Sequence, residues 1–451
     1  MDSIREIVAS FGGTMRERIL FVGMAFFLLG IVVVWFTRFF DEMGAEYSEN
    51  RFVRWCRCKR KYYGENLTFD IAAKVFLAAL FIRLVFYLAG LLICTQFVEY
   101  YKELEKFTFQ DFLGSWKRWD STHYINLAQK GYDGYIENGQ HLFLVFFPLY
   151  PWAVRIFQAF ISNWEVAGLF VSTLFFCVGS VFFYGTILEE YGREIAKRSL
   201  VLLSFYPFSF FFGGIMSESL FFCLLSAGFF CIRRHKWLAA GIIGAFCSMC
   251  RIQGILLMGV GFVEFFVTYQ PIECLRKKRF ADFIQALLKK GSFLLLTMAG
   301  CLVYLGINKS VEGDWFRFRV YQKEHWYHTT TFVADSIDEI IYYITNADIL
   351  MKRYVWVPEL VIFIAAMLLL LYSLRRHPLR YSAFLFVYTI VNYSVTFLIS
   401  GGRYMACALT AFLFLAEWTT GRKTLYYIIL FLFICLIGVY FHGFMSGQQV
   451  L

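Results

Sequence analysis

Long apolar runs recur from one end of the chain to the other, separated by short polar segments. Three of these runs contain no Asp, Glu, Lys or Arg, at residues 19–37, 199–217 and 381–402. Each run is long enough to cross about 30 Å of hydrocarbon as one helix, because an α-helix rises about 1.5 Å per residue. The pattern therefore predicts an all-α polytopic membrane protein.

The apolar pattern predicts twelve spans, and one further segment would make thirteen. The spans cover residues 19–38, 71–97, 165–187, 199–215, 217–232, 237–250, 252–269, 292–309, 356–373, 381–400, 404–420 and 425–442. The further segment, 141–161, is apolar enough to enter the membrane. Pro148 and Pro151 interrupt its helix, and Arg155 lies within it. We therefore interpret this segment as re-entrant or parallel to the membrane.

Clusters of Lys and Arg between the spans set the expected orientation. They lie at 51–61, 193–198, 233–236, 276–279, 375–380 and 422–423. Such clusters stay preferentially on the cytoplasmic side of a membrane, and placing all six there fixes the alternation of the spans. Both termini and two long loops, 98–141 and 310–355, are then expected on the outer side.

The composition supports the same class of protein. The chain is 59% hydrophobic and only 17% charged, whereas charged residues make up about a quarter of a soluble domain. No polar segment of about 100 residues is left to fold in water, which excludes a soluble enzyme with one anchor. The net charge of +10 is spread over short clusters, so it favours an orientation signal over a nucleic-acid-binding face. Most of the twelve cysteines lie in apolar runs, where a thiol behaves as a small hydrophobic group.

The first outer loop concentrates polar and aromatic residues. Its candidate site residues are Trp119, Asp120, His123, Tyr132 and His141. For a single Trp or Tyr the simpler interpretation is an interfacial anchor. A carboxylate near the hydrocarbon boundary is costly unless it is hydrogen-bonded or used, and Asp120 can act as a general base. The alternative is an ion pair of Asp120 with Lys117 or Arg118.

Further polar residues interrupt apolar runs on the same expected face. They are Glu218, Arg251, Gln253 and Arg403, with Tyr404 beside the last. Singly, each could be a charge at a helix end. Together, a carboxylate, two guanidinium groups and an amide indicate a polar cavity for an anionic ligand, because arginine binds phosphate through a bidentate fork.

The second outer loop adds Gln322, Trp326 and the pair His325 and His328. Stacking and hydrogen-bonding side chains of this kind suit the binding of a polyol. Two histidines without a carboxylate pair are a weak metal signal, so we expect no obligatory metal. A soluble nucleotide donor has no recognisable motif either, because the chain lacks a phosphate-binding loop and a dinucleotide-binding fingerprint.

Short motifs along the chain resemble one known family when they are taken in order. They are Trp-Asp-Ser-Thr-His-Tyr at 119–124, Gly-Tyr at 131–132, Phe-Phe-Pro at 146–148, Tyr-Pro at 206–207, Ser-Glu-Ser-Leu-Phe at 217–221, Arg-Ile-Gln-Gly at 251–254 and Gly-Gly-Arg-Tyr at 401–404. This series is similar to the PIG-V family, the GPI mannosyltransferase 2 group, over roughly residues 105–420. The segment 313–316, with Gln322 and Trp326, looks more like the prokaryotic branch. The family's Asn-Pro and Arg-Ser-Asn-Gly are replaced here at 206–207 and 251–254.

The resemblance implies a GT-C glycosyltransferase whose catalytic carboxylate falls on Asp120. It implies a polyprenyl-phosphate sugar as donor and inversion at the anomeric carbon. We therefore expect transfer of a hexose, mannose in this family, to a hydroxyl of a lipid-linked or cell-envelope glycan. Arg403 and Arg251 would stabilise the lipid phosphate, and His123 and Glu218 would orient Asp120 or sugar hydroxyls.

Three other functions stay open at this point: a eukaryotic-type GPI mannosyltransferase 2, a lipid or glycolipid transporter or flippase, and a catalytically inert subunit of a glycosylation complex. Polar residues clustered at one face favour an enzyme over a transporter, which needs a polar path through the membrane. Expected partners are membrane lipids, the lipid-linked donor and the glycan acceptor, with no nucleic acid. An accessory membrane subunit is compatible with this interpretation. A bacterial cell membrane is the favoured location, with the endoplasmic reticulum membrane as the alternative.

The expected organisation has four parts. Residues 1–65 form an extra N-terminal span with a basic cytoplasmic loop. Residues 66–310 form a transmembrane core that includes the catalytic outer loop 98–141. The second outer loop covers 311–355, and C-terminal transmembrane helices cover 356–451.

Overall fold

The computed structural model describes residues 15–45, 50–57 and 64–450. Parts of the predicted N-terminal unit and of the 51–61 basic cluster lie outside these described residues. Within them the chain is helical, and the β contacts are two isolated bridges, Glu137 with Gln140 and Thr330 with Val395. The predicted all-α membrane class is confirmed, because seven helical stretches are long and apolar enough to cross a membrane.

Seven of the twelve predicted spans fall on these long stretches. The stretches are Met15–Glu42 (α2), Phe69–Phe97 (α4), Trp164–Tyr191 (α9), Ile252–Arg276 (η3 Ile252–Ile255, α13 Leu256–Tyr269 and α14 Pro271–Arg276), Phe280–Glu312 (α15 Phe280–Lys289, η4 Gly291–Leu296 and α16 Thr297–Glu312), Ile349–Ser373 (α19 Ile349–Met351, η5 Lys352–Trp356 and α20 Val357–Ser373) and Lys423–Met445 (α24). The η4 turn is a 3-10 helix and η5 is a π-helix.

The other five predicted spans fall on shorter helices. These are α10 (Arg193–Ser204), α11 (Glu218–Arg233), α12 (Trp237–Cys250), α21 (Leu379–Tyr393) and α23 (Leu409–Trp418). They have 10 to 16 residues, too few to cross about 30 Å alone. Many side chains of these helices are buried, and in α11 nearly every side chain is. Interrupted helices are tolerated at membrane depth where protein surrounds them.

The charge-free run 199–217 is not one helix, contrary to the prediction. Helix α10 ends at Ser204, a 3-10 turn (η2) covers Ser209–Gly213, and α11 begins at Glu218. Pro207 lies in the gap and has no backbone N–H to donate, so a continuous helix would lose a hydrogen bond there.

The charge-free run 381–402 is likewise interrupted. Helix α21 ends at Tyr393, and the next residues pair with the second outer loop instead. The Thr331 backbone N–H donates to the carbonyl of Ser394 (3.0 Å), and that of Thr396 donates to the carbonyl of Thr329 (2.9 Å). An apolar run without charges therefore indicates that its side chains are buried, but the run need not form one continuous helix.

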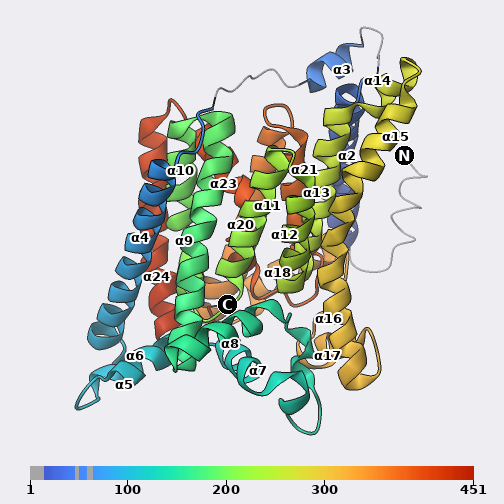
Figure 1. Ribbon diagram of the computed structural model, residues 1–451. Helices are drawn as coiled ribbons and strands as arrows, with labels where there is room; N and C mark the ends of the chain where they lie inside the picture. Colours follow the sequence, from blue (N-terminus) through green and yellow to red (C-terminus); the bar gives the residue numbers. More distant parts are fainter. Residues whose placement is uncertain (1–14, 46–49, 58–63, 451) are drawn as a thin grey trace.

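The basic segments lie together at one end of the bundle, which we call the basic end. Figure 1 shows α3 (Arg51–Cys56), α14 and α15 at this end. Contacts join the other basic segments to it: Arg375 donates to the carbonyl of Trp55 (2.5 Å), Arg193 pairs with Glu65 (2.8 Å), and Arg198 donates to the carbonyl of Thr419 (2.8 Å). The alternation of spans expected from the charges requires such a grouping.

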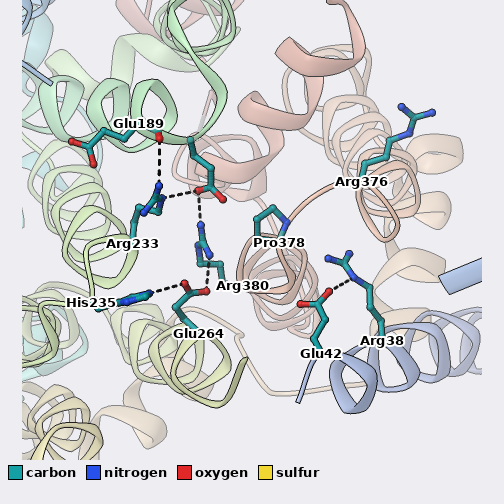
Figure 2. A pocket seen from close by; sticks show the side chains of 10 residues that line it. Arg38, Glu42, Glu189, Arg233, His235, Glu264, Arg376, Pro378 and Arg380 are labelled. Atoms are coloured by element: carbon teal, nitrogen blue, oxygen red, sulfur yellow. Dashed lines mark hydrogen bonds and ion pairs between the residues drawn. The ribbon is translucent and has the colours of Figure 1, made fainter. Parts of the chain in front are cut away.

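A charged pocket of about 510 Å³ opens at the basic end (Figure 2). Arg380, at its centre, donates to Glu264 (2.6 Å) and also bonds to Glu190. Arg233 pairs with Glu190 (3.5 Å), and His235 Nε2 lies 3.2 Å from a Glu264 oxygen. These five residues, the Arg380 cluster, join the ends of α9, α11, α13 and α21.

The opposite end, the loop end, carries both predicted outer loops (Figure 1). Its helices are α5 (Glu99–Lys102), α6 (Phe109–Trp116), α7 (Ser121–Gly134), α8 (Leu149–Ile161), α17 (Arg317–His325) and α18 (Val333–Asn346), with a 3-10 turn, η1, at Leu142–Val145. Helix α8 occupies the segment that we interpret as re-entrant or membrane-parallel. It has 13 residues, which is too short for a span.

Helix α2 lies at the periphery of the bundle, as an additional span would. Its buried residues are Leu28, Ile31 and Arg38. Arg16 pairs with Asp338 of α18 at 2.9 Å, and Arg38 donates to the carbonyl of Leu374 at 2.7 Å. The helix is therefore attached at both ends and contributes little to the core.

Candidate active site

Four charged side chains meet at the loop end, and each comes from a break in helical structure. Asp120 directly precedes α7, Glu218 is the first residue of α11, and Arg251 separates α12 from η3. Arg403 lies in the short helix α22 (Gly401–Met405). Because each residue ends or begins an apolar segment, their charges meet without lying in the middle of a span. We call these residues the Arg403 cluster.

Arg403 is the centre of this cluster. Its Nη1 lies 2.6 Å from Asp120 Oδ2, and its Nε bonds to Glu218 Oε1. Arg251 Nη1 reaches the same Glu218 oxygen at 3.0 Å. Two guanidinium groups and two carboxylates thus form one connected network with balanced charge. Hydrogen bonds between charged groups are about twice as strong as neutral ones, which orients all four side chains.

Burial distinguishes the two carboxylates. The side chain of Glu218 is 0% exposed and that of Arg403 is 3% exposed, whereas Asp120 is 28% exposed. A buried carboxylate needs cations to offset its desolvation, and Glu218 has two. Asp120 is the member of the network that a molecule from outside can reach.

The backbone at Asp120 forms a tight turn. Trp119 has a φ of 50°, in the left-handed region that non-glycine residues rarely adopt. The Ser121 N–H donates to the carbonyl of Arg118 at 3.0 Å and closes the turn. This strained connection between α6 and α7 directs Asp120 toward Arg403. Backbone strain of this kind is frequent at functional sites.

Several buried polar atoms beside the network have no hydrogen-bond partner within the described chain. They are Trp119 Nε1, Ser121 Oγ and Glu218 Oε2. Buried polar atoms are nearly always paired in a folded protein. The unpaired atoms are thus an indole N–H and a hydroxyl on the two chain neighbours of Asp120, and a carboxylate oxygen within the Arg403 cluster.

Aromatic rings surround the two arginines. The guanidinium carbon of Arg251 lies 4.9 Å from the ring centre of Tyr404, and that of Arg403 lies 5.6 Å from the ring centre of Phe211. Cations over aromatic faces are stabilised by the ring quadrupole. Tyr404 therefore belongs to the site, where its ring packs against the guanidinium group of Arg251.

The sequence alternative for Asp120, an ion pair with Lys117 or Arg118, is wrong. Lys117 pairs with Glu165 at 3.1 Å, and Arg118 donates to the carbonyl of Met445 at 2.7 Å. Asp120 pairs instead with Arg403, which lies 283 residues further along the chain.

His123 and Tyr132 lie in α7 beside the network, and the polar atoms of both form hydrogen bonds with other residues. His123 Nδ1 is 3.0 Å from the hydroxyl of Tyr135, and its ring stacks on Phe143 at 4.2 Å. Burial lowers the pKa of His123, while Asp120 and Glu137 act in the opposite direction. Tyr132 donates to the carbonyl of Phe146 at 2.7 Å. These residues shape the wall of the site, and the contacts above do not join them to Asp120.

His141 and Gln253 connect elements around the site. His141 Nδ1 lies 2.7 Å from Glu312 Oε1, which links the first outer loop to the end of α16. The Gln253 side-chain amide donates to Asn392 Oδ1 at 3.0 Å, linking η3 to α21.

The second outer loop packs onto the first. Trp326 lies edge-on to Phe143 and Phe146, with ring centres 6.5 and 6.3 Å apart. The carbonyl of Gln322 accepts the N–H groups of Trp326 and His328. Burial lowers the pKa of His328, and its hydrogen bond to the Phe397 carbonyl and the Asp120 carboxylate oppose this shift. His328, in the second outer loop, therefore lies close enough to Asp120 for the carboxylate to affect its pKa.

One buried carboxylate next to the Arg403 cluster is not among the residues predicted from the sequence. Glu359 is 2% exposed and accepts the backbone N–H groups of Gly401 and Gly402, next to Arg403. The signal was available, because Glu359 is the only charged residue in 357–373, as Glu218 is the only acidic residue in 217–232.

Comparison with known proteins identifies the family. The family model described as mannosyltransferase (PIG-V) matches residues 73–314, more than half of the chain. The chain belongs to the PIG-V mannosyltransferase family. The matched region contains Asp120, Glu218 and Arg251, whereas Arg403 lies beyond it. The resemblance of the short motifs to PIG-V is thereby confirmed.

Other comparisons add less about this PIG-V family member. No curated protein matches the chain significantly. A solved structure, ArnT from Cupriavidus metallidurans bound to undecaprenyl phosphate, shares 13% sequence identity with it at a TM-score of 0.48. That match covers 78% of this chain and 60% of ArnT, so the chain spans less than two thirds of its length. Among the described residues, no group of three or more His, Cys, Asp or Glu side chains could hold a metal ion.

Proposed function

We propose that this protein transfers a hexose, mannose by analogy with its family, from a polyprenyl-phosphate sugar to a glycan hydroxyl. The acceptor is a lipid-linked or cell-envelope glycan, and the anomeric carbon is inverted. The observation that carries the proposal is the Arg403 cluster, in which a partly exposed carboxylate is held by a buried arginine. This arrangement combines a base with a phosphate-binding cation in one site.

The reaction assigned to the site is a single displacement. The acceptor hydroxyl loses its proton to Asp120 while its oxygen forms a bond to the anomeric carbon of the donor. The bond from that carbon to the phosphate oxygen breaks, and its electron pair leaves on the polyprenyl phosphate. Arg403 holds Asp120 through Oδ2, so we assign Oδ1 to the acceptor proton.

The arginines are suited to the leaving phosphate. The bonds described above use Nε and Nη1 of Arg403 and Nη1 of Arg251. Within the described chain no hydrogen bond engages Nη2 of either group, so each can donate to an anionic ligand. Charge that grows on the phosphate in the transition state would meet preorganised donors with little surrounding water.

An apolar groove supports a lipid-linked donor. It has a volume of about 330 Å³ and lies between residues 206–208, α20, α23 and α24, with Tyr206, Met405 and Tyr440 in its wall. Tyr206 donates to the carbonyl of Gly402 at 3.1 Å, next to Arg403. We assign the carrier chain to this groove, because it joins an apolar surface to the charged site.

The rival function of transporter or flippase is less well supported. A transporter needs polar groups along a path across the membrane. The Arg403 cluster and the Arg380 cluster lie at opposite ends of the bundle, and an apolar core occupies the space between them.

The test is a transfer assay with detergent-purified protein. Polyprenyl-phosphate mannose and the matching nucleotide sugar are compared as donors, and proton NMR of the product reports the anomeric configuration. We expect turnover with the lipid-linked donor alone and inversion at the anomeric carbon. Turnover with the nucleotide sugar alone, or retention of configuration, would contradict the proposal. Mass spectrometry of lipid-linked saccharides from cells with and without the gene then identifies the acceptor.

A further inference from the structure

Glu359 is a buried carboxylate that the proposed mechanism does not use. It lies in the first turn of α20 and is 2% exposed. None of the ion pairs in the described chain involves it. A carboxylate buried without a cation needs hydrogen-bond donors to offset the loss of water. Its contacts therefore indicate what it does.

Two of these donors are backbone groups of the turn that carries Arg403. Glu359 Oε1 accepts the N–H of Gly401 at 2.6 Å and the N–H of Gly402 at 3.2 Å. Tyr393 donates to Glu359 Oε2 at 3.1 Å and to the Glu359 carbonyl at 2.9 Å. Every one of these partners lies at the junction of α20, α21 and α22.

The N-terminus of α22 lacks a cap of its own. The first N–H groups of a helix have no intrahelical acceptor, and a side chain at the N-cap position usually supplies one. Ser400 occupies that position and makes no side-chain capping bond. Glu359, on a different helix, supplies the acceptor instead.

The glycine before Arg403 fits this arrangement. A Cβ placed on Gly401 would lie 2.0 Å from Glu359 Oε2, so only glycine allows the carboxylate to approach. Other contacts hold the same turn from other sides: Tyr206 donates to the Gly402 carbonyl, and Tyr388 donates to the Tyr404 carbonyl at 2.8 Å. The backbone on both sides of Arg403 is thus fixed.

We propose that Glu359 is a positioning residue, which caps α22 from α20 and thereby holds Arg403 in place between Asp120 and Glu218. The inference rests on the proposed function for its kinetic consequence, but its structural part stands independently. Only the acceptor oxygen of Glu359 is required, because both N–H groups bond to Oε1. A glutamine at this position retains that oxygen, whereas a leucine does not.

The test compares Glu359→Leu, Glu359→Gln and a matched control. The control is Glu417→Leu, because Glu417 is also 2% exposed but bonds to Tyr372 at the far end of α23. Amide hydrogen exchange of the peptide containing residues 400–405 is measured by mass spectrometry in detergent. We expect faster exchange in Glu359→Leu and wild-type exchange in Glu359→Gln and Glu417→Leu. Unchanged exchange in Glu359→Leu overturns the inference, whether or not the protein is a transferase.

Kinetics supply the second measurement. Glu359→Leu should lower kcat about 10- to 100-fold, because a small displacement of a catalytic group has effects of this size. The donor KM should change much less, and Glu359→Gln should retain kcat within about fivefold. If Glu359→Leu and Glu417→Leu lose activity only in proportion to folded protein, Glu359 is merely structural. A Gln variant as impaired as the Leu variant also contradicts a role as acceptor.

Discussion

Two arginines occupy similar networks at opposite ends of the bundle. Each bonds to two carboxylates: Arg403 to Asp120 and Glu218, and Arg380 to Glu190 and Glu264. In each network a second arginine shares one of the carboxylates, Arg251 on Glu218 and Arg233 on Glu190. The charges and connections alone therefore do not distinguish a catalytic site from a structural one.

The two networks differ in how evenly they are buried. At the basic end, Glu190 and Glu264 are 14% and 12% exposed, and both lie within helices, α9 and α13. At the loop end, Glu218 is fully buried and Asp120, on a strained turn, is 28% exposed. The Arg380 cluster joins helices through two carboxylates that are about equally buried, whereas the Arg403 cluster leaves one carboxylate, that of Asp120, partly exposed. The predictions below test this difference.

Replacing the exposed carboxylate should have the largest effect. Asp120→Asn keeps the shape of the side chain but removes its basicity, so transfer should fall at least about 100-fold. The matched change at the basic end, Glu190→Gln, should leave kcat close to wild type. Rates are measured with purified proteins of equal folded content. Residual transfer by Asp120→Asn above about a tenth of the wild-type rate would exclude Asp120 as the base.

The two arginines should respond differently to replacement by lysine. Arg403→Lys exchanges a bidentate fork for a point charge where negative charge grows, so kcat should fall about 10- to 100-fold and the donor KM should change less. Arg380→Lys should lower the melting temperature and leave kcat nearly unchanged. Wild-type kinetics in the Arg403→Lys variant would mean that the Arg403 cluster, like the Arg380 cluster, only joins helices.

Labelling with impermeant thiol reagents tests which end faces outward. A cysteine introduced at Asn138, in the first outer loop, should react in intact cells, and one introduced at Lys278, beside α14, should not. Labelling of the native cysteines is subtracted as background. The reverse pattern would place the Arg403 cluster in the cytoplasm and exclude an outer lipid-linked donor.

The smallest expected effect concerns the contact between the outer loops. His141 and Glu312 are each about one-fifth exposed, and such pairs contribute about 0.2–1 kcal/mol. His141→Ala should therefore raise the acceptor KM no more than about fivefold and leave kcat unchanged. The control is Lys74→Ala, which removes the exposed pair with Asp70 near the basic end. A loss of kcat as large as that of Asp120→Asn would assign His141 to the chemistry instead.

The sequence contains much of the fold and part of the site. Seven of the twelve predicted spans fall on long helical stretches and the other five on shorter helices, because burial in lipid or protein selects apolar side chains. Apolar composition does not show where a helix ends. In 199–217 the break is indicated by Pro207, whereas α21 ends at Tyr393, where the chain pairs with the second outer loop. Glu218, Arg251 and Arg403 could be grouped because each is a charge where an apolar run breaks.

The partners within the site could not be predicted from sequence. Asp120 lies next to two cations in the chain and pairs with neither, because α6 directs Lys117 and Arg118 toward Glu165 and Met445. Such choices depend on the packing of distant helices. Glu359 is also the only charged residue of its apolar run, but its partners are backbone N–H groups of Gly401 and Gly402, which the sequence does not reveal.

The separation of Asp120 and Arg403 along the chain has a consequence for biosynthesis. The ribosome completes the first outer loop and α11 long before it reaches Arg403 in α22, 283 residues beyond Asp120. Until then the nascent protein holds Glu218 with only one of its two cations, a state that is costly in a low-dielectric interior. A product truncated before α22 would keep the whole region matched by the family and lack Arg403. Insertion of the last helices thus completes the Arg403 cluster, on which the proposed activity depends.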